Sequence, residues 1–523
     1  MTETIPSVLR DAASRFGDHE AVVDEGVRIS FRDLLERAEE VAAALVASGV
    51  APGDRVAIWA PNSGAWIVSS FGIYLAGAVL VPLNTRYKGG EAAHVLGTAE
   101  AKVLLTVTDF LGADYVGMLE DADVRDALDE IVVIQGPTRE GTTTWDDFVA
   151  RGSARDRDEM RRRAAAVAPD DTSDIIFTSG TTGAPKGAML GHGASVRTYR
   201  VWSELVGLRE GDRYLLVYPL FHTAGLKSVV LASVMTGATI VPEPVFEVAQ
   251  VMKRVADERI SVLPGPPTVF QTILDDPDLA SYDLSSLRLS VTGAAVVPVQ
   301  VIEQMRDVLK FENVVTGYGL TETTGTISMC RHDDPPDVIA TTVGKPLPGV
   351  DVRVVDDDGN DVPPGQPGEF IARGFNVMKG YFNNPEATAD ASVDGWLRTG
   401  DIGYLDGDGN LVITDRKKDM FIVGGFNAYP AEIEKMMLDH PDIAQVAVVG
   451  VPDERLGETG GAFVVAASGH TVDPDEVVAW CRERMANFKV PRQVQIVDAL
   501  PVTPSGKVMK FVLRDQLAAG LTN

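Results

Sequence analysis

The apolar positions of the chain follow two patterns that alternate along its first part. Between Ser30 and Gly49 they recur at helical spacing, and Ser30 with Asp33 resembles a capping box, which predicts an amphipathic helix. Elsewhere, short apolar runs are bounded by proline and glycine, as buried parallel strands usually are. These runs are RVAIWAP, AVLVPLN, YLLVYPL, ATIVPEP, ISVLPGPP and RLSVTGA. The alternation of helices with buried strands predicts α/β layers.

The pattern changes after about residue 345. The stretch VDVRVVDDDGNDVPPGQPGEFIARG predicts two strands with a turn at Asp358-Gly359, and therefore a smaller, β-rich region. From Asp415 onward, predicted helices and strands mix in a unit of about a hundred residues, a typical size for a small domain. We therefore predict an N-terminal domain of layered α/β subdomains plus the β-rich region over residues 1–417, and a small, mobile α+β domain over residues 418–523.

Composition narrows the function of the chain. Its 523 residues can bury more than one core, and its formal net charge of -28 argues against nucleic acid or an anionic membrane surface as the main partner. Cys330 and Cys481 are far apart and lack metal-ligand spacing, so we expect neither a disulfide framework nor a metal–sulfur site. The N-terminus lacks the features of a signal peptide, and no apolar run approaches membrane-spanning length. We therefore expect a cytoplasmic protein.

The stretch FTSGTTGAPKGAML, residues 177–190, has the composition of a phosphate-binding loop. Glycine lets backbone N–H groups approach phosphate oxygens closely, and hydroxyl groups and Lys186 add further donors. The order Pro185-Lys186-Gly187 differs from that of the ordinary P-loop, in which lysine follows glycine directly and a metal-binding hydroxyl comes next. A GTPase-like or kinase-like use of this loop is therefore disfavoured.

Further patches contain residues suited to nucleotide chemistry. Thr321 and Glu322 follow an apolar run, at a strand end where oxygen ligands can hold Mg²⁺. Asp401 follows a glycine turn and can accept hydrogen bonds from ribose hydroxyl groups. Charges cluster over 415–419, and Lys507 ends a Pro-Ser-Gly-Lys turn. Each patch alone has a simpler explanation, such as a solvated carboxylate, a turn cap or surface charge. Their order along the chain is what favours a shared function.

In this order the motifs resemble those of the adenylate-forming superfamily, which comprises acyl-CoA synthetases, luciferases and the adenylation domains of peptide synthetases. The resemblance spans nearly the whole chain. It implies that residues 178–187 wrap the β- and γ-phosphates of ATP, and that a carboxylic acid is activated as an acyl-adenylate with release of pyrophosphate. Such catalysis needs cations and fixed donors more than a covalent nucleophile. In agreement, the chain has neither the GxSxG motif of hydrolases nor the HExxH motif of zinc peptidases.

The resemblance also implies roles for single residues. Lys507 corresponds to the catalytic lysine, and Lys418 to the hinge about which the small domain rotates between the half-reactions. Thr321 and Glu322 would contact the phosphates and Mg²⁺. His222 corresponds to the residue at the mouth of the acyl pocket, although a hydrogen-bonded core histidine is the commoner fate of a His beside apolar residues.

Three groups of residues are implied to bind the nucleotide, and one to bind CoA. The phosphate group consists of Thr178, Ser179, Gly180, Thr181, Thr182, Gly183 and Lys186. The adenine walls are Gly293, Ala294 and Ala295 on one side and Gly317, Tyr318 and Gly319 on the other. The ribose clamp is Asp401 and Arg416, and the tunnel for the pantetheine thiol is lined by Gly424 and Gly425.

The implied acyl pocket is mostly apolar with a few hydroxyl groups. Its candidates are Phe221, Thr223, Ala224, Leu226, Lys227, Val291, Gly293, Thr324 and Thr326. Lys227 departs from this pattern: it is either solvated or supports a loop, or it is a polar handle for a carbonyl or second carboxylate on a bulky acid. Relatives that activate amino acids place an aspartate near the pocket mouth, where this chain has Phe221-His222-Thr223, so amino acids are disfavoured.

Several longer segments resemble actinobacterial acyl-CoA ligases of steroid degradation, a group that includes a ligase for an indane-propionate. These segments are PLNTRY, SDIIFTSGTTG, ISVLPGPPTVF, RLSVTGAAVVP and MFIVGGFNAYPAE. We therefore expect an acyl-CoA synthetase that uses ATP, Mg²⁺ and CoA on a bulky alicyclic, medium-chain or aromatic acid. Two details depart from the family pattern: the ending Lys507-Val508-Met509-Lys510, and Lys417 at a hinge-side position that is often apolar.

Some alternatives stay open at this point. No carrier domain is fused to the chain, which favours free CoA over a carrier protein as the thiol, and oxidative luciferase chemistry has a low prior. A non-catalytic nucleotide-binding relative would lack Glu322 or Lys507, and both are present. Acetylation of Lys507 would remove the catalytic charge, so a lysine acetyltransferase is a candidate partner. A homodimer also stays open.

Overall fold

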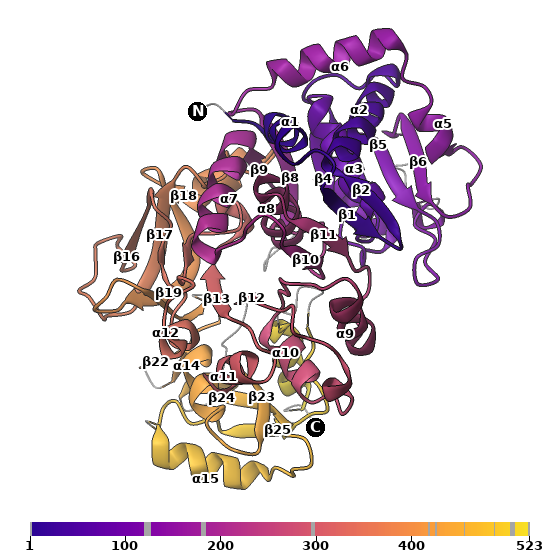
Figure 1. The fold of residues 1–523 in the computed structure, drawn as a ribbon. Helices are drawn as coiled ribbons and strands as arrows, with labels where there is room; N and C mark the ends of the chain where they lie inside the picture. Colours follow the sequence, from indigo (N-terminus) through magenta and orange to yellow (C-terminus); the bar gives the residue numbers. More distant parts are fainter. Residues whose placement is uncertain are drawn as a thin grey trace.

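The fold is seen in a computed structural model that describes residues 3–119, 127–178, 185–293, 299–416, 419–423, 426–453, 456–485, 487–502 and 508–520. The molecule is elongated (Figure 1), with the N-terminal helices at one end and the C-terminal residues, drawn in yellow, at the other. The α/β class predicted from the sequence is confirmed.

The largest sheet contains several of the runs predicted as buried strands. Its order is β7-β6-β5-β3-β4-β8-β9, and all neighbours are parallel except β8 and β9. The strands are β3 (Arg55–Trp59), β4 (Val79–Pro82), β5 (Ala101–Val107), β6 (Glu130–Gln135), β7 (Thr143–Thr144), β8 (Thr172–Thr178) and β9 (Lys186–Gly191). The helices of this part are α1 (Ile5–Phe16), α2 (Phe31–Ala47), α3 (Gly64–Leu75), α4 (Gly89–Ala99), η1 (Gly117–Leu119), α5 (Trp145–Val149) and α6 (Ala154–Ala166). The glycine-rich loop therefore follows the carboxyl end of a parallel strand, the usual place for ligands in such sheets.

Helix α2 confirms the prediction made from its sequence. The Ser30 hydroxyl accepts the Asp33 N–H at 3.1 Å, and the Asp33 carboxylate accepts the Ser30 N–H at 3.3 Å, which makes a capping box. The helix ends at Ala47, and Gly49 follows with a φ of 83°, a conformation that favours glycine. Its predicted apolar face is buried at Leu34, Ala38, Val41 and Leu45.

A second sheet has two parts joined by one residue. The orders of the parts are β10-β11-β1-β2 and β12-β13-β14-β15, and Val262 pairs in parallel with Tyr214 of one and Leu289 of the other. The strands are β1 (Glu20–Asp24), β2 (Val27–Ser30), β10 (Arg213–Leu216), β11 (Thr239–Pro242), β12 (Leu289–Gly293), β13 (Asn313–Tyr318), β14 (Ser328–Met329) and β15 (Lys345–Pro346). The helices are α7 (His192–Val206), the π-helix η3 (Ala224–Leu231), α8 (Ala232–Thr236), α9 (Val248–Asp257), α10 (Pro267–Leu274), η4 (Leu279–Ser281), α11 (Val299–Asp307), η5 (Thr321–Thr323) and α12 (Pro336–Thr341).

The prediction of a full strand over ISVLPGPP is wrong. Within this stretch, which the structure describes throughout, Val262 alone forms bridges. The reason is the run of prolines at positions 264, 266 and 267, because proline has no N–H group to donate to a neighbouring strand.

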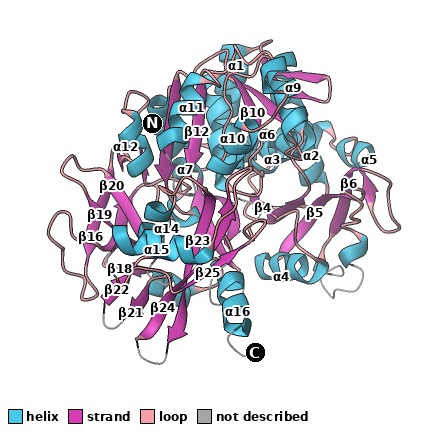
Figure 2. Cartoon of the chain, turned by 90° about the horizontal axis from the view of Figure 1, so that it is seen from below, coloured by secondary structure: helices cyan, strands magenta, loops and turns pink. Residues whose placement is uncertain are grey.

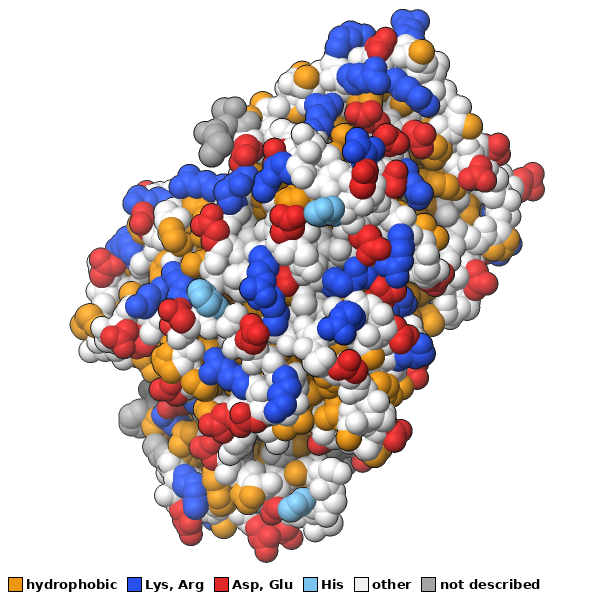
Figure 3. Space-filling model, in the orientation of Figure 1, with side chains coloured by type: hydrophobic (Ala, Val, Ile, Leu, Met, Phe, Trp, Pro, Cys, Tyr) orange, Lys and Arg blue, Asp and Glu red, His pale blue; other side chains and the backbone are white. Residues whose placement is uncertain are grey.

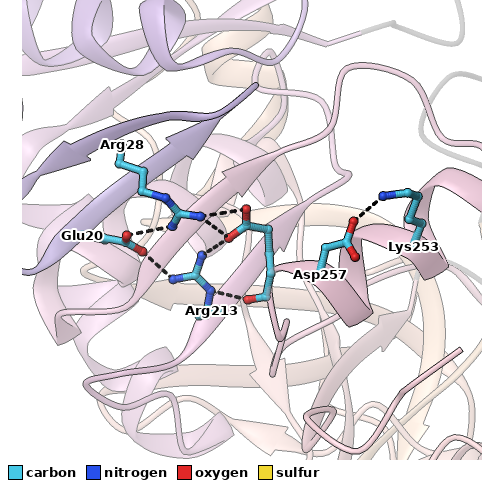
Figure 4. Close-up of polar contacts among 6 residues, drawn as sticks. Glu20, Arg28, Arg213, Lys253 and Asp257 are labelled. Carbon is cyan, nitrogen blue, oxygen red and sulfur yellow. Dashed lines mark hydrogen bonds and ion pairs between the residues drawn. The ribbon is translucent and has the colours of Figure 1, made fainter.

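Within the second sheet, an ion-pair network links the hairpin of β1 and β2 to β10 and to the end of α9 (Figure 4). Arg28 and Arg213 each contact the Glu20 carboxylate at 2.7 Å, and they contact Glu258 at 3.1 and 2.5 Å respectively. Burial acts to raise the pKa of Glu20, but the hydrogen bonds from Arg213 and Arg28 outweigh it, so the pKa is lowered. Residues from β1, β2, β10 and the end of α9 are thereby held together.

The region after residue 345 is antiparallel, as predicted. Its order is β16-β17-β19-β18, with β20 beside β19. The turn at Asp358-Gly359 is confirmed, because Val355 and Asp361 pair across it and Gly359 has a φ of 84°. The elements are β16 (Val350–Val355), β17 (Gly368–Gly374), α13 (Pro385–Ala391), β18 (Ser392–Val393), β19 (Trp396–Leu405) and β20 (Leu411–Arg416).

The C-terminal unit is built on a sheet of order β22-β21-β24-β23, with β25 parallel to β24. Its elements are β21 (Phe421–Val423), β22 (Phe426–Ala428), α14 (Pro430–Met437), β23 (Ile443–Asp453), β24 (Gly457–Ala466), α15 (Pro474–Arg484), β25 (Gln493–Ile496) and α16 (Lys510–Gly520). Seen from below (Figure 2), α14, α15 and β23 are drawn near the centre of the picture, because this unit lies at the lower end of the molecule in Figure 1.

This unit has core clusters of its own on both faces of the sheet. Val446 and Val448 of β23 pack into a cluster that includes residues of α14 and α15, whereas Val449 and Val451 pack into another with Leu513 and Leu517 of α16. The alternation follows from the two-residue period of a strand. The boundary at Lys417 and Lys418 stays a prediction, because both lie outside the described residues.

The surface carries charge of both signs. On the face drawn in Figure 3, acidic and basic side chains are interspersed. Among the residues that the structure describes, every helix is too short or too polar to cross a membrane. Cys330 and Cys481 are buried free thiols, and burial raises the pKa of each to about 11, so both stay protonated and unreactive at neutral pH.

The crossing of α2 and α3 depends on Gly72, where an added Cβ would lie 2.5 Å from the Cγ1 atom of Val41. We predict that Gly72→Ala lowers the free energy of unfolding by about 1–3 kcal/mol in a denaturant titration, because overpacking has that cost. In a Val41→Gly background both clashing atoms of Val41, Cγ1 at 2.5 Å and Cβ at 2.6 Å, are absent, so the same change at Gly72 should cost less. Equal destabilisation in both backgrounds would contradict this account.

Candidate active site

The glycine-rich loop joins the ends of a tight strand pair. Thr178 at the end of β8 faces Lys186 at the start of β9, so the loop leaves and re-enters the sheet at one point. Both residues are half-buried, and the Lys186 ammonium lies 5.4 Å from the ring centroid of Tyr381. Ser179, Gly180, Thr181, Thr182 and Gly183 lie outside the described part of the chain. The two described ends of the loop therefore lie next to each other, and Lys186 lies beside an aromatic ring.

The two predicted adenine walls are neighbours. Gly293 at the end of β12 pairs with Gly317 of β13, although Ala294 and Ala295 lie beyond the described residues. After β13 the backbone at Gly319 comes very close to the backbone at Gly325: a Cβ added to Gly319 would lie 2.4 Å from the Gly325 carbonyl oxygen. Only glycine fits this close approach.

The predicted ribose clamp lies against the same strand end. The Tyr318 hydroxyl is 2.5 Å from Oδ2 of Asp401, a buried carboxylate on β19. Asp401 pairs across the sheet with Arg416 of β20, whose side chain is not among those described. The structure thus joins an adenine-wall residue and a ribose-clamp residue that are distant in sequence.

Glu322 lies in the short helix η5 and is held from two sides. Its Oε1 atom accepts a hydrogen bond of 2.7 Å from the Tyr381 hydroxyl, and its carbonyl oxygen accepts the Met378 N–H at 2.7 Å. Burial raises the pKa of Tyr381, and the Glu322 charge raises it further, so this phenol stays a donor. Tyr381 therefore lies between Lys186 and Glu322, and it is a residue that the sequence analysis missed.

The oxygen atoms of Thr321 and Glu322 suit Mg²⁺. Among the described residues no group of three His, Cys, Asp or Glu side chains could hold a metal ion. Mg²⁺ does not need such a cage, because it is commonly bound through one or two carboxylates together with substrate phosphates. One carboxylate and one hydroxyl group next to a predicted phosphate-binding loop therefore fit this ion.

The predicted acyl pocket comes from three separate segments, and two of them are in contact. Thr223, at the start of the π-helix, faces Gly325, at which an added Cβ would lie 2.9 Å from the Thr223 hydroxyl and 2.5 Å from the Tyr199 hydroxyl. Thr324 is buried with a φ of 55°, and its hydroxyl donates to the Asn376 carbonyl at 2.7 Å. The π-helix and the segment after η5 are thereby brought into contact.

The other pocket candidates surround these contacts. The ring centroids of Phe221 and His222 lie 4.7 Å apart, with Phe221 buried and His222 half-buried. Thr326 is buried, and its carbonyl accepts a hydrogen bond of 2.7 Å from the Asn376 side chain. Leu226 is buried on the π-helix, whereas Ala224 and Val291 are half-buried. Asn376 and Tyr199 gave no signal in the sequence, because each takes part only through tertiary contacts.

Lys227 is buried and has an ionic partner. Its side chain is 1% exposed, and its ammonium is 2.5 Å from Oδ2 of Asp174, which is fully buried on β8. The cavity beside it has a volume of about 10 Å³, enough for one water molecule. The solvated alternative is wrong, and the geometry gives no support to a polar handle for the acid, because the ammonium already has a buried partner. The signal in the sequence was a carboxylate inside the apolar run SDIIF.

Four further predicted residues lie outside the part of the chain that the structure describes. They are Lys418, Gly424, Gly425 and Lys507, and their roles stay predictions.

Two family models match the chain. The model of the AMP-binding enzyme matches residues 9–382, and that of the AMP-binding enzyme C-terminal domain matches residues 432–507. The chain belongs to the AMP-binding enzyme family. The predicted superfamily is thereby confirmed.

Relatives in this family are similar over almost their whole length. The 7a-methyl-1,5-dioxo-octahydro-1H-inden-4-yl propanoyl:CoA ligase of Rhodococcus jostii is 49% identical over 99% of this chain and 100% of its own. The ligase of the same name from Mycobacterium tuberculosis is 46% identical over 98% of each chain. A crystal structure of an anthranilate CoA ligase with anthranoyl-AMP matches with a TM-score of 0.89 at 28% identity, over 99% of this chain and 98% of that one. The expected enzyme class, a CoA ligase with ATP and CoA as substrates, is confirmed at this level.

Tyr381 can be tested by removing its hydroxyl group. We predict that Tyr381→Phe lowers the rate of acid-dependent pyrophosphate release by about 10- to 150-fold, because a hydrogen bond to a charged group contributes roughly 1.5–3 kcal/mol. Tyr115→Phe is the matched control, since it also loses one 2.7 Å hydrogen bond, to the Thr85 carbonyl in the turn after β4. Equal losses in the two variants would show that Tyr381 acts only on stability.

His192 predicts a pH dependence of stability. It is buried at the start of α7 against Tyr74, and burial lowers its pKa from 6.5 to about 4, opposed by Asp174. The unfolded chain therefore binds more protons between these values, and the free energy of unfolding should fall by up to about 3 kcal/mol from pH 6.5 to pH 4. Denaturant titrations of the wild type and His192→Phe should differ in slope over this range, and identical slopes would contradict the prediction.

Proposed function

We propose that this member of the AMP-binding family converts a bulky bicyclic carboxylic acid, ATP and CoA into an acyl-CoA, AMP and pyrophosphate. A carboxylate oxygen of the acid attacks the α-phosphorus of ATP, and the bond to pyrophosphate breaks. The thiolate sulfur of CoA then attacks the acyl carbon, and AMP leaves. The observation that carries the proposal is the meeting of Lys186, Tyr381 and Glu322 at the strand ends, within a chain similar to CoA ligases over its whole length.

The residues would act as follows. Lys186 and the loop after Thr178 would bind the β- and γ-phosphates, and Lys507 would neutralise charge that develops on the α-phosphate. Glu322 and Thr321 would hold Mg²⁺, which when bound supplies positive charge to the phosphates. Tyr381 would keep the Glu322 carboxylate in place.

The remaining roles concern binding. Gly293, Ala294, Ala295, Gly317, Tyr318 and Gly319 would enclose adenine, and Asp401 with Arg416 would bind the ribose hydroxyl groups. His222 would stand at the mouth of the acyl pocket. Lys418 would be the hinge of residues 418–523, and Gly424 with Gly425 would line the thiol tunnel once that domain has rotated.

The proposed acid is an octahydroindene-dione propanoate or a close bicyclic analogue. Two relatives named for that acid, at 49% and 46% identity, support this choice. The apolar side chains of Phe221, Leu226 and Ala224, with the hydroxyl groups of Thr223, Thr324 and Thr326 among them, suit a large ring system with a few polar groups. A straight short-chain acid would leave such a pocket poorly filled.

Further aspects remain predictions from the sequence. These are a cytoplasmic location, a homodimer, and acetylation of Lys507 as a means of switching off adenylation. A carrier protein in place of CoA is the remaining alternative for the thiol.

A panel of acids tests the proposed substrate. Acetate, octanoate, benzoate and an octahydroindene-dione propanoate would each be supplied with ATP, Mg²⁺ and CoA, and both pyrophosphate and thioester would be measured. We expect the highest kcat/KM with the bicyclic acid. A higher value with octanoate or benzoate would overturn the proposed substrate, and pyrophosphate without thioester would indicate a carrier protein as acceptor.

Lys507→Ala tests the proposed catalytic lysine in the same assay. Adenylation should fall by about 100- to 1,000-fold, because loss of one preorganised donor has that effect. Conversion of supplied acyl-adenylate and CoA should persist. Lys510→Ala is the matched control, since this lysine contacts Glu434 at 2.8 Å. Retention of adenylation in Lys507→Ala would contradict the assigned role.

A further inference from the structure

A buried carboxylate draws three elements of the N-terminal domain together. Asp174 on β8 lies 2.5 Å from each of three polar atoms: the Tyr74 hydroxyl of α3, the Lys227 ammonium of the π-helix, and the hydroxyl of its neighbour Ser173. Both charged side chains are almost fully buried. No predicted role in substrate binding accounts for this cluster.

Burying the charges of Lys227 and Asp174 costs free energy unless the two side chains stay paired. Burial lowers the pKa of Lys227, and the Asp174 carboxylate opposes this by favouring the ammonium form. A buried ion pair contributes little net stability compared with well-packed apolar residues, whereas loss of one partner leaves an uncompensated charge. Such a pair therefore selects one arrangement of its elements more than it stabilises the fold.

The two partners belong to elements that lead to two different parts of the candidate active site, the phosphate loop and the acyl pocket. Asp174 is on the strand that ends at Thr178, where the phosphate loop begins. Lys227 is on the π-helix that follows Phe221, His222 and Thr223. The N–H group after this helix, from Ala232, donates to the Lys227 carbonyl, which is the wider spacing of a π-helix. Insertions of this kind are frequent at functional sites.

Other groups face the pair from neighbouring elements. His192 of α7 meets the Tyr74 ring edge-on at 5.7 Å between centroids, and the Lys227 ammonium lies 5.4 Å from that same ring centroid. The π-helix thus contacts β8 through one ion pair, and it contacts α3 through the Tyr74 ring.

We propose that Lys227 and Asp174 are positioning residues that hold the acyl-pocket helix at a set distance from the strand that carries the phosphate loop. The inference rests on the proposed function, since adenylation requires the carboxylate of the acid to meet the α-phosphate of ATP. The pair touches neither substrate. It fixes the separation of the two segments that bind them, and a small error in such a separation has a large effect on rate.

Kinetics of the two half-reactions test the proposal. Lys227→Met and Asp174→Asn should each lower kcat/KM for adenylation by about 10- to 100-fold, with the same factor for every acid that the wild type uses. Conversion of supplied acyl-adenylate and CoA should be unchanged. The double variant should recover part of the loss, because neither partner is then left as an unpaired buried charge.

A direct contact between Lys227 and the acid gives a different result. The loss would then be confined to acids that carry a keto group or a second carboxylate, and the double variant would recover nothing. That outcome would overturn the positioning role.

A second buried ion pair provides the matched control. Arg288 and Asp212 are likewise buried, with Arg288 Nε 2.7 Å from Asp212 Oδ1, and they lie at the amino ends of β12 and β10, away from the phosphate loop. Arg288→Met should reduce stability while kcat and KM per folded molecule stay unchanged. If it lowered adenylation as much as Lys227→Met does, the effect would be a general loss of packing and the proposal would fail.

Hydrogen exchange tests the same idea without any activity. In Lys227→Met, amides of residues 172–178 and 223–231 should exchange faster together, and the double variant should reverse part of the change. Tyr74→Phe, which keeps the ion pair, should show a smaller effect and provides the comparison if Lys227→Met does not fold. Faster exchange in only one of the two segments would overturn the coupling. If the wild type formed no product with any acid, the proposed function would be refuted. The hydrogen-exchange result would still test the positioning role, because hydrogen exchange does not depend on enzyme activity.

Discussion

The carboxylate of Asp174 is a charge with no access to water, and the arrangement of the N-terminal domain follows from the need to pair it. Its partners come from a helix that packs on the large sheet and from the π-helix beside the second sheet. In a medium of low dielectric constant an unpaired charge is expensive, so these elements have few alternative positions. The position of β8, the strand that leads to the phosphate loop, is therefore fixed by the contacts of Asp174 with Tyr74 and Lys227.

The candidate active site is formed by the ends of strands, including the end of β8 that follows Asp174. β8 ends opposite Lys186 of β9, and β12 and β13 end side by side at Gly293 and Gly317. The later β-rich region supplies Tyr381, which contacts Glu322, and Asp401, which contacts Tyr318. Two short hydrogen bonds from tyrosines to carboxylates join these parts. Each phenol orients a carboxylate that the proposed function assigns to the nucleotide or its metal ion.

The sequence predicted some elements well and others poorly, for identifiable reasons. Helix α2 was predicted with its cap and its buried face, because capping and helical periodicity depend on neighbouring residues only. The apolar residues of ISVLPGPP predict a strand, but the run does not form a full one, because its prolines have no N–H groups to donate to a neighbouring strand. Lys227 is an acyl-pocket candidate because it lies next to other candidates in sequence, and that neighbourhood gives no indication of its buried ionic partner, Asp174.

By itself the sequence determined the α/β layers, the antiparallel region, the separate C-terminal unit and the types of residue needed for adenylate chemistry. These depend on local periodicity, turn residues and short motifs, which a chain carries within a few residues. The tertiary structure alone decided that Tyr381 contacts Glu322, that Tyr318 contacts Asp401, and that Lys227 pairs with Asp174. Each of these contacts joins residues far apart in the chain, and only the packing of buried sheets and helices brings such residues within hydrogen-bonding distance.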